Sequence, residues 1–150
     1  SWIDYDNDGW LDTFSANGTI IVLEGHEQVK FPYDQTRLLF RNLGNGRFED
    51  VSSKAGAAFA QSESGRGAAF GDVDNDGDID ILVGNDAGPA RLLINNVGNR
   101  QHWVGLRLVG ATAARDMLGA RVGVTGSDGR TLWRRVRSDG SYASASDPRV

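Results

Sequence analysis

Two acidic stretches of the sequence contain the residues best suited to bind a metal ion. Residues 4–12 read DYDNDGWLD and residues 72–80 read DVDNDGDID, so carboxylates stand at positions 1, 3, 5 and 9 of each stretch and a glycine at position 6. Ca²⁺ binds about six to eight oxygen ligands, and alternate residues of a tightly wound loop can supply them. Glycine allows the sharp reversal because it reaches positive φ without a Cβ clash. The spacing therefore predicts two calcium loops.

The predicted ligands repeat position by position, as four carboxylates and one main-chain carbonyl in each loop. The first set is Asp4, Asp6, Asp8 and Asp12 with the carbonyl of Trp10, and the second is Asp72, Asp74, Asp76 and Asp80 with the carbonyl of Asp78. Polar turns are the alternative interpretation, because Asn, Asp and Gly are common turn residues. Two matches over nine residues argue against it, and clustered carboxylates repel one another unless a cation neutralises them.

An EF-hand is a second alternative, but its loop ends with a glutamate at position 12 and lies between two helices. Position 12 is Ser15 after the first stretch and Val83 after the second. The segments that leave the loops, Thr13–Ser15 and Ile81–Val83, contain β-branched and aromatic residues that favour strands. The loops are therefore predicted to lead into β-strands.

The composition excludes several classes of site. The chain has no cysteine, which excludes disulfides, thiolate catalysis and cysteine-bound zinc. The formal net charge is −4, and two bound Ca²⁺ ions would neutralise it, so the acidity need not indicate a basic partner. Residues 101–150 carry 8 Arg against 4 Asp, but these arginines are spread along expected strands without clustered aromatic residues, which argues against nucleic-acid binding. No apolar run reaches the roughly 20 residues that a transmembrane helix needs.

A second motif indicates that the calcium loops belong to a repeat. Residues 37–45 read RLLFRNLGN and residues 91–99 read RLLINNVGN. The loops begin 68 residues apart, at positions 4 and 72, whereas these motifs begin 54 residues apart, at positions 37 and 91. The first repeat therefore has 14 additional residues, which fall within residues 19–36. Recurrence at one fixed order is the sequence signature of stacked structural units.

Each repeat is predicted to contain a calcium loop, an exit strand, a second strand, a hairpin and a third strand. In the first repeat, Asn45-Gly46 is a hairpin turn and Arg47–Val51 is the return strand. Residues 52–59 are expected to form a short helical turn, and residues 61–67 a polar connector. A four-stranded propeller blade has this content. Residues 1–100 are therefore predicted to form about two blades of a partial, calcium-binding β-propeller.

Residues 101–150 differ in character, and we predict a small β-rich domain with a boundary near residue 100. Trp103–Val109 alternates as a strand, and two further strands, Arg121–Thr125 and Arg130–Arg137, flank the turn at residues 126–129. Residues 111–120 are expected to form a loop or one helical turn. The fold class predicted for the whole chain is all-β.

These motifs resemble two known families. Residues 71–80 together with residues 39–51 resemble the FG-GAP/VCBS repeat of integrin-like β-propellers. The ASPIC/UnbV domain is resembled by residues 102–110, 119–125, 136–142 and 146–147. This order of propeller repeats followed by ASPIC/UnbV is similar to the cartilage acidic protein family and its bacterial relatives.

The resemblance implies a secreted or cell-surface protein, periplasmic if bacterial, with calcium-bearing blades and no established enzyme activity. Only the ten loop residues named above carry over as ligands. The chain begins at the calcium loop of a blade and ends where the family continues into a closing strand, so we expect a fragment. No cysteine-rich module of the kind found in some animal members is present in the sequence, which favours a bacterial source.

Other residue types suited to chemistry form weaker patterns. His26 lies between Glu24 and Glu27 in the insertion, and this trio could ligate a second metal. A solvated surface loop is the preferred interpretation, and the insertion is also the first candidate for contacting a partner. The acids outside the calcium loops form no recognisable pair of the kind that glycosidases use.

The sequence thus predicts a calcium-binding extracellular or cell-surface scaffold that binds a protein or a polysaccharide, with structural calcium and no catalytic residues. The alternative is a secreted hydrolase or lyase whose active site lies on propeller blades outside this sequence.

Overall fold

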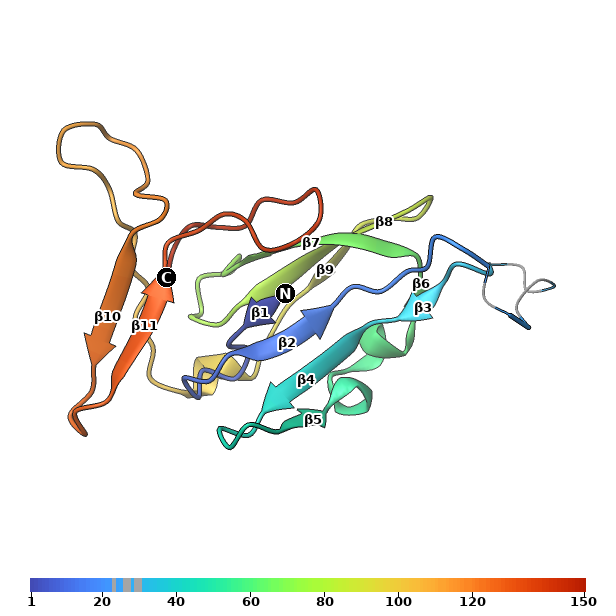
Figure 1. The fold of residues 1–150 in the computed structure, drawn as a ribbon, viewed down its shortest axis with the longest axis horizontal. Helices are drawn as coiled ribbons and strands as arrows, with labels where there is room; N and C mark the ends of the chain where they lie inside the picture. Colours follow the sequence, from blue (N-terminus) through green and yellow to red (C-terminus); the bar gives the residue numbers. More distant parts are fainter. Residues whose placement is uncertain (23, 26–27, 29–30) are drawn as a thin grey trace.

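The computed structural model describes residues 1–22, 24–25, 28 and 31–150, and over these residues the chain is all-β, as predicted. Two antiparallel sheets form the larger part of the molecule (Figure 1). The first has the order β1-β2-β4-β5, with strands Trp2–Ile3, Asp12–Ser15, Leu38–Asn42 and Phe48–Asp50. The second has the order β7-β8-β9, with strands Gly65–Gly71, Asp80–Asn85 and Arg91–Leu93.

Smaller elements link the two sheets. The short strands β3 (Gln35–Thr36) and β6 (Ser62–Glu63) pair with each other. The helical turn expected over residues 52–59 is present as two 3₁₀ helices, η1 (Ser52–Lys54) and η2 (Ala57–Ala60). The third 3₁₀ helix of the described chain, η3 (Gly98–Arg100), follows the second sheet.

The hydrophobic core lies between the two sheets. Phe14 of β2 is 1% exposed and packs edge-on against Phe59 and Phe70, with ring centroids 6.1 Å apart in both pairs. The buried core consists of Ile3, Phe14, Leu39, Val51, Phe59, Ala68, Ile81 and Val83. Because burying a large apolar side chain stabilises a fold by about 1.5–3 kcal/mol, this shared core holds the two sheets together.

The two sheets bury opposite faces. Phe14 pairs with Leu39 in the first sheet, and both side chains are buried. The corresponding pair in the second sheet, Leu82 and Leu92, is 46% and 49% exposed, while the neighbouring Ile81 is buried. Each sheet therefore turns one face toward its neighbour, which is the geometry of stacked repeats.

The strand registers correct the predicted spacing of the repeat by one residue. The main-chain nitrogen of Asn42 donates to Asp12 Oδ1, and that of Asn95 donates to Asp80 Oδ1, at 2.8 Å in both cases. Positions 42 and 95 are 53 residues apart, not 54. The letters RLL and GN align best at 54 residues, but strand pairing and the hydrogen bonds to the loops set the structural equivalence. The offset of 54 was therefore wrong, and the insertion has one further residue.

Two predicted segments differ from the structure. Residues 61–67 were expected to be a polar connector, but they contain β6 and the start of β7, because the Glu63 carboxylate finds cationic partners within the fold. Trp103–Val109 was expected to be a strand and has only an isolated bridge from Val109 to Asp116. Leu106 exchanges two main-chain hydrogen bonds with Val150, so that segment lacks a partner strand long enough to extend the pairing.

The C-terminal region forms a hairpin and then returns to the second sheet. The hairpin strands β10 (Arg121–Thr125) and β11 (Thr131–Arg135) lie where the sequence predicted strands, and residues 111–120 form a loop. The final segment runs along β7 (Figure 1), where Ser146 Oγ accepts a hydrogen bond from the main chain of Phe70 at 3.2 Å. This segment covers an edge strand that would otherwise expose unpaired backbone groups. The domain boundary near residue 100 stays a prediction.

In the part of the chain that the structure describes, no helix has the length and apolar character needed to cross a membrane.

Candidate metal centres

Each acidic loop joins two antiparallel strands of one sheet. The first loop lies between β1 and β2, and the second between β7 and β8. Gly9 and Gly77 have φ values of 89° and 95°, and Asn7 and Asn75 have φ values of 53° and 59°. Glycine, and to a lesser degree asparagine, tolerates this left-handed conformation. The shared Asp-Asn-Asp-Gly sequence therefore gives both loops the same backbone path.

The structure brings three carboxylates of each loop into one cluster. The carboxylate oxygens of Asp4, Asp6 and Asp8 lie within 4.8 Å of one another, as do those of Asp72, Asp74 and Asp80. Asp4 Oδ1 and Asp6 Oδ1 are buried and have no hydrogen-bond partner. A buried, unpaired carboxylate oxygen is costly unless a cation or a donor satisfies it. All-oxygen donors of this kind fit a hard cation such as Ca²⁺.

Two predicted ligands lie beside the clusters and take part in hydrogen bonds. Asp12 accepts from the main-chain nitrogens of Tyr5 at 3.1 Å and Asn42 at 2.8 Å. Asp76 accepts from the main-chain nitrogen of Asp78 at 3.3 Å and from the side-chain nitrogen of Asn99. The roles of these two side chains, and of the Trp10 and Asp78 carbonyls, as direct ligands stay predictions.

Burial makes the charged form of several loop carboxyls unfavourable. Asp12 and Asp78 are 0% exposed, and burial raises the pKa of each to about 6. Burial also raises the pKa of Asp4, against the opposing charge of Arg134. A divalent cation beside these groups would favour the ionised carboxylates. The loops therefore have an electrostatic demand that bound calcium meets.

The sequence analysis missed the arginines that contact the loops. Arg41 Nε lies 2.8 Å from Asp6 Oδ2, and its Nη2 lies 3.3 Å from Asp8 Oδ2. Arg134 of β11 places Nη2 at 2.7 Å from Asp4 Oδ2. These partners are far apart in the sequence, so spacing gives no signal for them.

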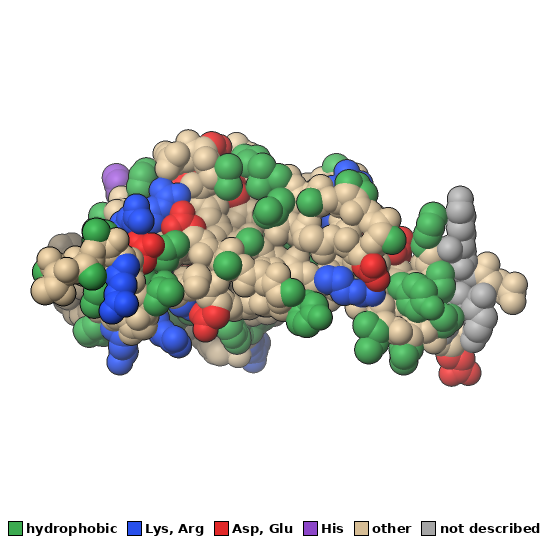
Figure 2. Space-filling view, turned by 90° about the horizontal axis from the view of Figure 1, so that it is seen from above, with side chains coloured by type: hydrophobic (Ala, Val, Ile, Leu, Met, Phe, Trp, Pro, Cys, Tyr) green, Lys and Arg blue, Asp and Glu red, His purple; other side chains and the backbone are tan. Residues whose placement is uncertain are grey.

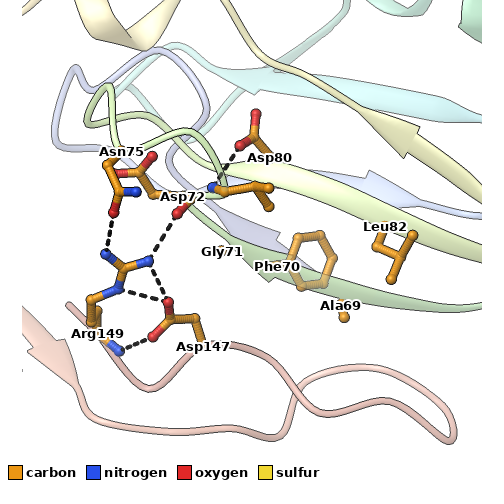
Figure 3. A pocket seen from close by; sticks show the side chains of 10 residues that line it. Ala69, Phe70, Gly71, Asp72, Asn75, Asp80, Leu82, Asp147 and Arg149 are labelled. Carbon is orange, nitrogen blue, oxygen red and sulfur yellow. Dashed lines mark hydrogen bonds and ion pairs between the residues drawn. The ribbon is translucent and has the colours of Figure 1, made fainter.

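Arg149 contacts the second loop in a different way. Its Nη2 donates to the main-chain oxygen of Asp72 at 2.8 Å, and its Nη1 donates to Asn75 Oδ1 at 3.0 Å. Its carboxylate partner is Asp147, at 2.6 Å from the same guanidinium (Figure 3). This arginine therefore supports the backbone of the loop rather than pairing with a carboxylate of the cluster. Figure 3 also places Phe70 and Leu82 on the apolar side of the same shallow hollow.

The two loops also contact each other. Asn7 Nδ2 donates to the main-chain oxygens of Gly77 and Gly98, at 3.0 Å in both cases. Asn95 Nδ2 donates to the main-chain oxygen of Tyr5 at 2.7 Å. The backbone of one loop is thus fixed in part by the other.

The insertion provides no further described site. His26 and Glu27 lie outside the described residues, so the possible second metal site at Glu24, His26 and Glu27 stays a prediction.

Comparisons with known proteins agree with this geometry. A family model for an FG-GAP-like repeat matches residues 4–83, and one for ASPIC and UnbV matches residues 110–150. Cartilage acidic protein 1 of Mus musculus is 45% identical over 56 residues, and that of Homo sapiens is 43% identical over 56 residues. Each match covers 37% of this chain and 8% of the relative, so the chain corresponds to a small part of those proteins. No solved structure is a significant match.

The FG-GAP-like match spans more than half of the chain and contains both acidic loops with the strands that lead into and out of them. The chain therefore belongs to the FG-GAP-like repeat family, and its repeats are followed by an ASPIC and UnbV segment.

Proposed function

We propose that this chain is a calcium-dependent scaffold of an extracellular or cell-surface protein, in which calcium is structural and the partner is a protein or a polysaccharide. The observation that carries the proposal is the recurrence of a carboxylate cluster at the same place in two stacked sheets. Membership in the FG-GAP-like family and the similarity to cartilage acidic protein 1 support an extracellular location. A periplasmic location follows if the source is bacterial.

The last aspartate of each loop has a positioning role in this scaffold. Asp80 accepts hydrogen bonds from the main chain of Val73, inside the loop, and of Asn95, beyond β9, at 2.8 Å each. Asp12 makes the equivalent pair of bonds in the first sheet. These carboxylates tie the loop to the far strand of the same sheet. A bound Ca²⁺ would supply the positive charge that lets the clustered carboxylates stay ionised, so its binding free energy adds to the stability of the fold.

We also propose that the chain has no catalytic role. The acids outside the loops are engaged in structural ion pairs, such as Glu63 with Arg37 and Arg91, and Glu49 with Lys54 at 2.7 Å. The alternative is a hydrolase or lyase site on other blades of a longer protein. Screening the full-length protein on polysaccharides and esters separates the two proposals. Turnover that disappears when a non-calcium acid is replaced would refute the scaffold proposal.

Thermal unfolding with calcium and with chelator tests the calcium assignment. We expect added Ca²⁺ to raise the Tm by several degrees, because a ligand that binds only the folded state stabilises it. Asp6→Asn and Asp74→Asn should each reduce that increase. Asp139→Asn is the matched control, since it removes the same charge from an exposed residue outside the clusters. An identical Tm with calcium and with chelator would refute calcium binding.

A further inference from the structure

The C-terminal region lies directly on the turn of each calcium loop. A Cβ on Gly9 would stand 3.2 Å from the side chain of Leu132, and a Cβ on Gly77 would overlap the indole ring of Trp103. The guanidinium of Arg130 lies over the ring of Trp10, 5.5 Å from its centroid. Figure 2 shows basic side chains, with acidic ones beside them, at the end of the molecule that contains the β10–β11 hairpin. The calcium loops are therefore part of the docking surface for this region.

In the first loop, the hairpin contributes a positive charge to the carboxylate cluster. Arg134 Nη2 lies 2.7 Å from Asp4 Oδ2 and 3.4 Å from the main-chain oxygen of Gly9. Only 30% of the Arg134 side chain and 14% of the Asp4 side chain is exposed, so water screens this pair weakly. Arg41 adds a second guanidinium on Asp6 and Asp8. Two arginines thus stand against the carboxylates that a cation would bind.

The second loop lacks such cations. Among the described residues, no Lys or Arg forms an ion pair with the clustered carboxylates of Asp72, Asp74 or Asp80. Position 7 is also Asp78 here, where the first loop has Trp10, and this adds a fifth acid. Asp78 Oδ1 is buried without a hydrogen-bond partner. The second loop is therefore the more negative of the two.

We propose that calcium and Arg134 compete for Asp4, so that calcium binding at the first loop weakens the docking of the β10–β11 hairpin. This inference rests on the proposed structural calcium sites. A divalent ion and a guanidinium on one carboxylate repel each other, and partial burial strengthens that repulsion. The second loop, without a competing cation, binds calcium first and more tightly. Filling the first loop then loosens the hairpin.

Thermodynamic linkage fixes the size of one effect from the other. If Arg134 lowers the calcium affinity of the first loop by some factor, bound calcium weakens hairpin docking by the same factor. The remaining hairpin contacts are smaller ones, such as Leu132 on Gly9 and a 3.2 Å hydrogen bond from Arg137 Nη2 to the main-chain oxygen of Trp2. Calcium would therefore control whether the first loop is covered by the hairpin or open to a partner.

Calcium titration of two charge-matched variants by calorimetry tests the competition. Arg134→Gln should tighten the weaker calcium site about tenfold, toward the lower end of typical coupling factors, and leave the tighter site unchanged. Arg135→Gln removes the same charge from the next residue of β11, which is exposed, and should leave both sites unchanged. Asp4→Asn and Asp72→Asn assign the two sites. Weaker binding by Arg134→Gln would show that the arginine orients Asp4 for calcium, and would overturn the proposal.

A distance measurement tests the hairpin directly. The chain has no cysteine, so spin labels can be attached at Ser127→Cys, in the exposed hairpin turn, and Asn45→Cys, in the exposed turn between β4 and β5. As calcium fills the weaker site, we expect the distance distribution to widen. Arg134→Gln should show the wide distribution without calcium. An unchanged distribution while that site fills would refute the release of the hairpin.

The outcomes separate this inference from the function on which it rests. If the wild-type chain binds no calcium at either loop, the proposed function is wrong and the competition with it. If both loops bind calcium but Arg134→Gln and Arg135→Gln behave alike, only the competition is wrong.

Discussion

The side chain of Asn7 in the first loop donates a hydrogen bond to the main-chain oxygen of Gly77 in the second loop, at 3.0 Å. The same nitrogen donates to the main-chain oxygen of Gly98 at 3.0 Å. Because Asn7 occupies the left-handed region with φ 53°, its backbone conformation and these bonds depend on each other. One residue therefore links the shape of both loops.

Replacing Asn7 should destabilise the fold and weaken this link. Asn7→Gly keeps the positive φ accessible and removes both hydrogen bonds, so we expect a loss of about 1–3 kcal/mol in the free energy of unfolding. Urea unfolding in the presence of chelator measures it. The matched control is Asn75→Gly, whose side chain contacts the exposed Arg149, and which should cost less. Equal losses in both variants would contradict a special role for the Asn7 bonds.

A second prediction uses two equivalent positions with opposite burial. Phe14 and Leu82 occupy the same place in β2 and β8, but Phe14 is 1% exposed and Leu82 is 46% exposed. Phe14→Ala should lower the free energy of unfolding by about 3–5 kcal/mol, because it leaves a cavity in the core. Leu82→Ala should lower it by under about 1 kcal/mol. Denaturant unfolding checks both values. A large loss for Leu82→Ala would mean that its face is covered in solution, by a further sheet or a second copy.

Glu63 gives a pH-dependent prediction. A hydrogen bond from Arg91, followed by the contact with Arg37, lowers the pKa of Glu63 to about 2, from a usual value of 4.5. Since the pKa in the folded state lies below that in the unfolded state, the stabilisation is complete above pH 4.5 and is lost as the pH falls toward 2. Glu63→Gln should therefore cost about 3 kcal/mol at pH 7, since it leaves the buried Arg37 without its counter-charge. The unfolding curves of the two proteins should converge near pH 2. Curves separated by a constant amount at all pH values would contradict the ion pair.

The buried loop carboxyls predict the opposite trend when calcium is chelated. Burial raises the pKa of Asp12 and Asp78 to about 6, from 3.8. A raised carboxyl pKa means that their contribution is present below pH 3.8 and is lost as the pH rises through 6. Calcium favours the ionised carboxylates, so the increase in Tm on adding calcium should be larger at pH 7 than at pH 5. Differential scanning calorimetry at the two pH values measures it. An increase that does not depend on pH would mean that these carboxyls do not respond to the ion.

Local patterns predicted the strands and loop turns, whereas the contacts between distant segments could not be read from the sequence. The strand that follows Asp80 and the β10–β11 hairpin depend on alternation and turn residues, which act over a few positions. Trp103–Val109 has the same alternation but no long partner strand, and pairing partners are not a local property. Arg134 reaches Asp4 across 130 positions, so neither spacing nor residue type indicated it.

The two loop glycines lead to the last prediction, because their surroundings differ although their backbones match. Gly77 has φ 95° and the Trp103 ring packed against it, while Gly9 has φ 89° and the flexible ends of Leu132 and Arg130 nearby. An alanine at either position carries the strain of positive φ, but only at Gly77 must a ring also move. Gly77→Ala should therefore lower the free energy of unfolding more than Gly9→Ala, by about 1–3 kcal/mol, the usual cost of overpacking.

A double variant separates the backbone strain from the clash. Trp103→Ala removes the ring, so Gly77→Ala should cost less in the Trp103→Ala background than in the wild type, and Gly9→Ala should cost the same in both. Urea unfolding of these variants gives the coupling between positions 77 and 103. A coupling of zero would mean that Trp103 does not cover the second loop in solution. A coupling that calcium removes would mean that the ion displaces the C-terminal region from the second loop as well, because the ring would then no longer limit what fits at Gly77.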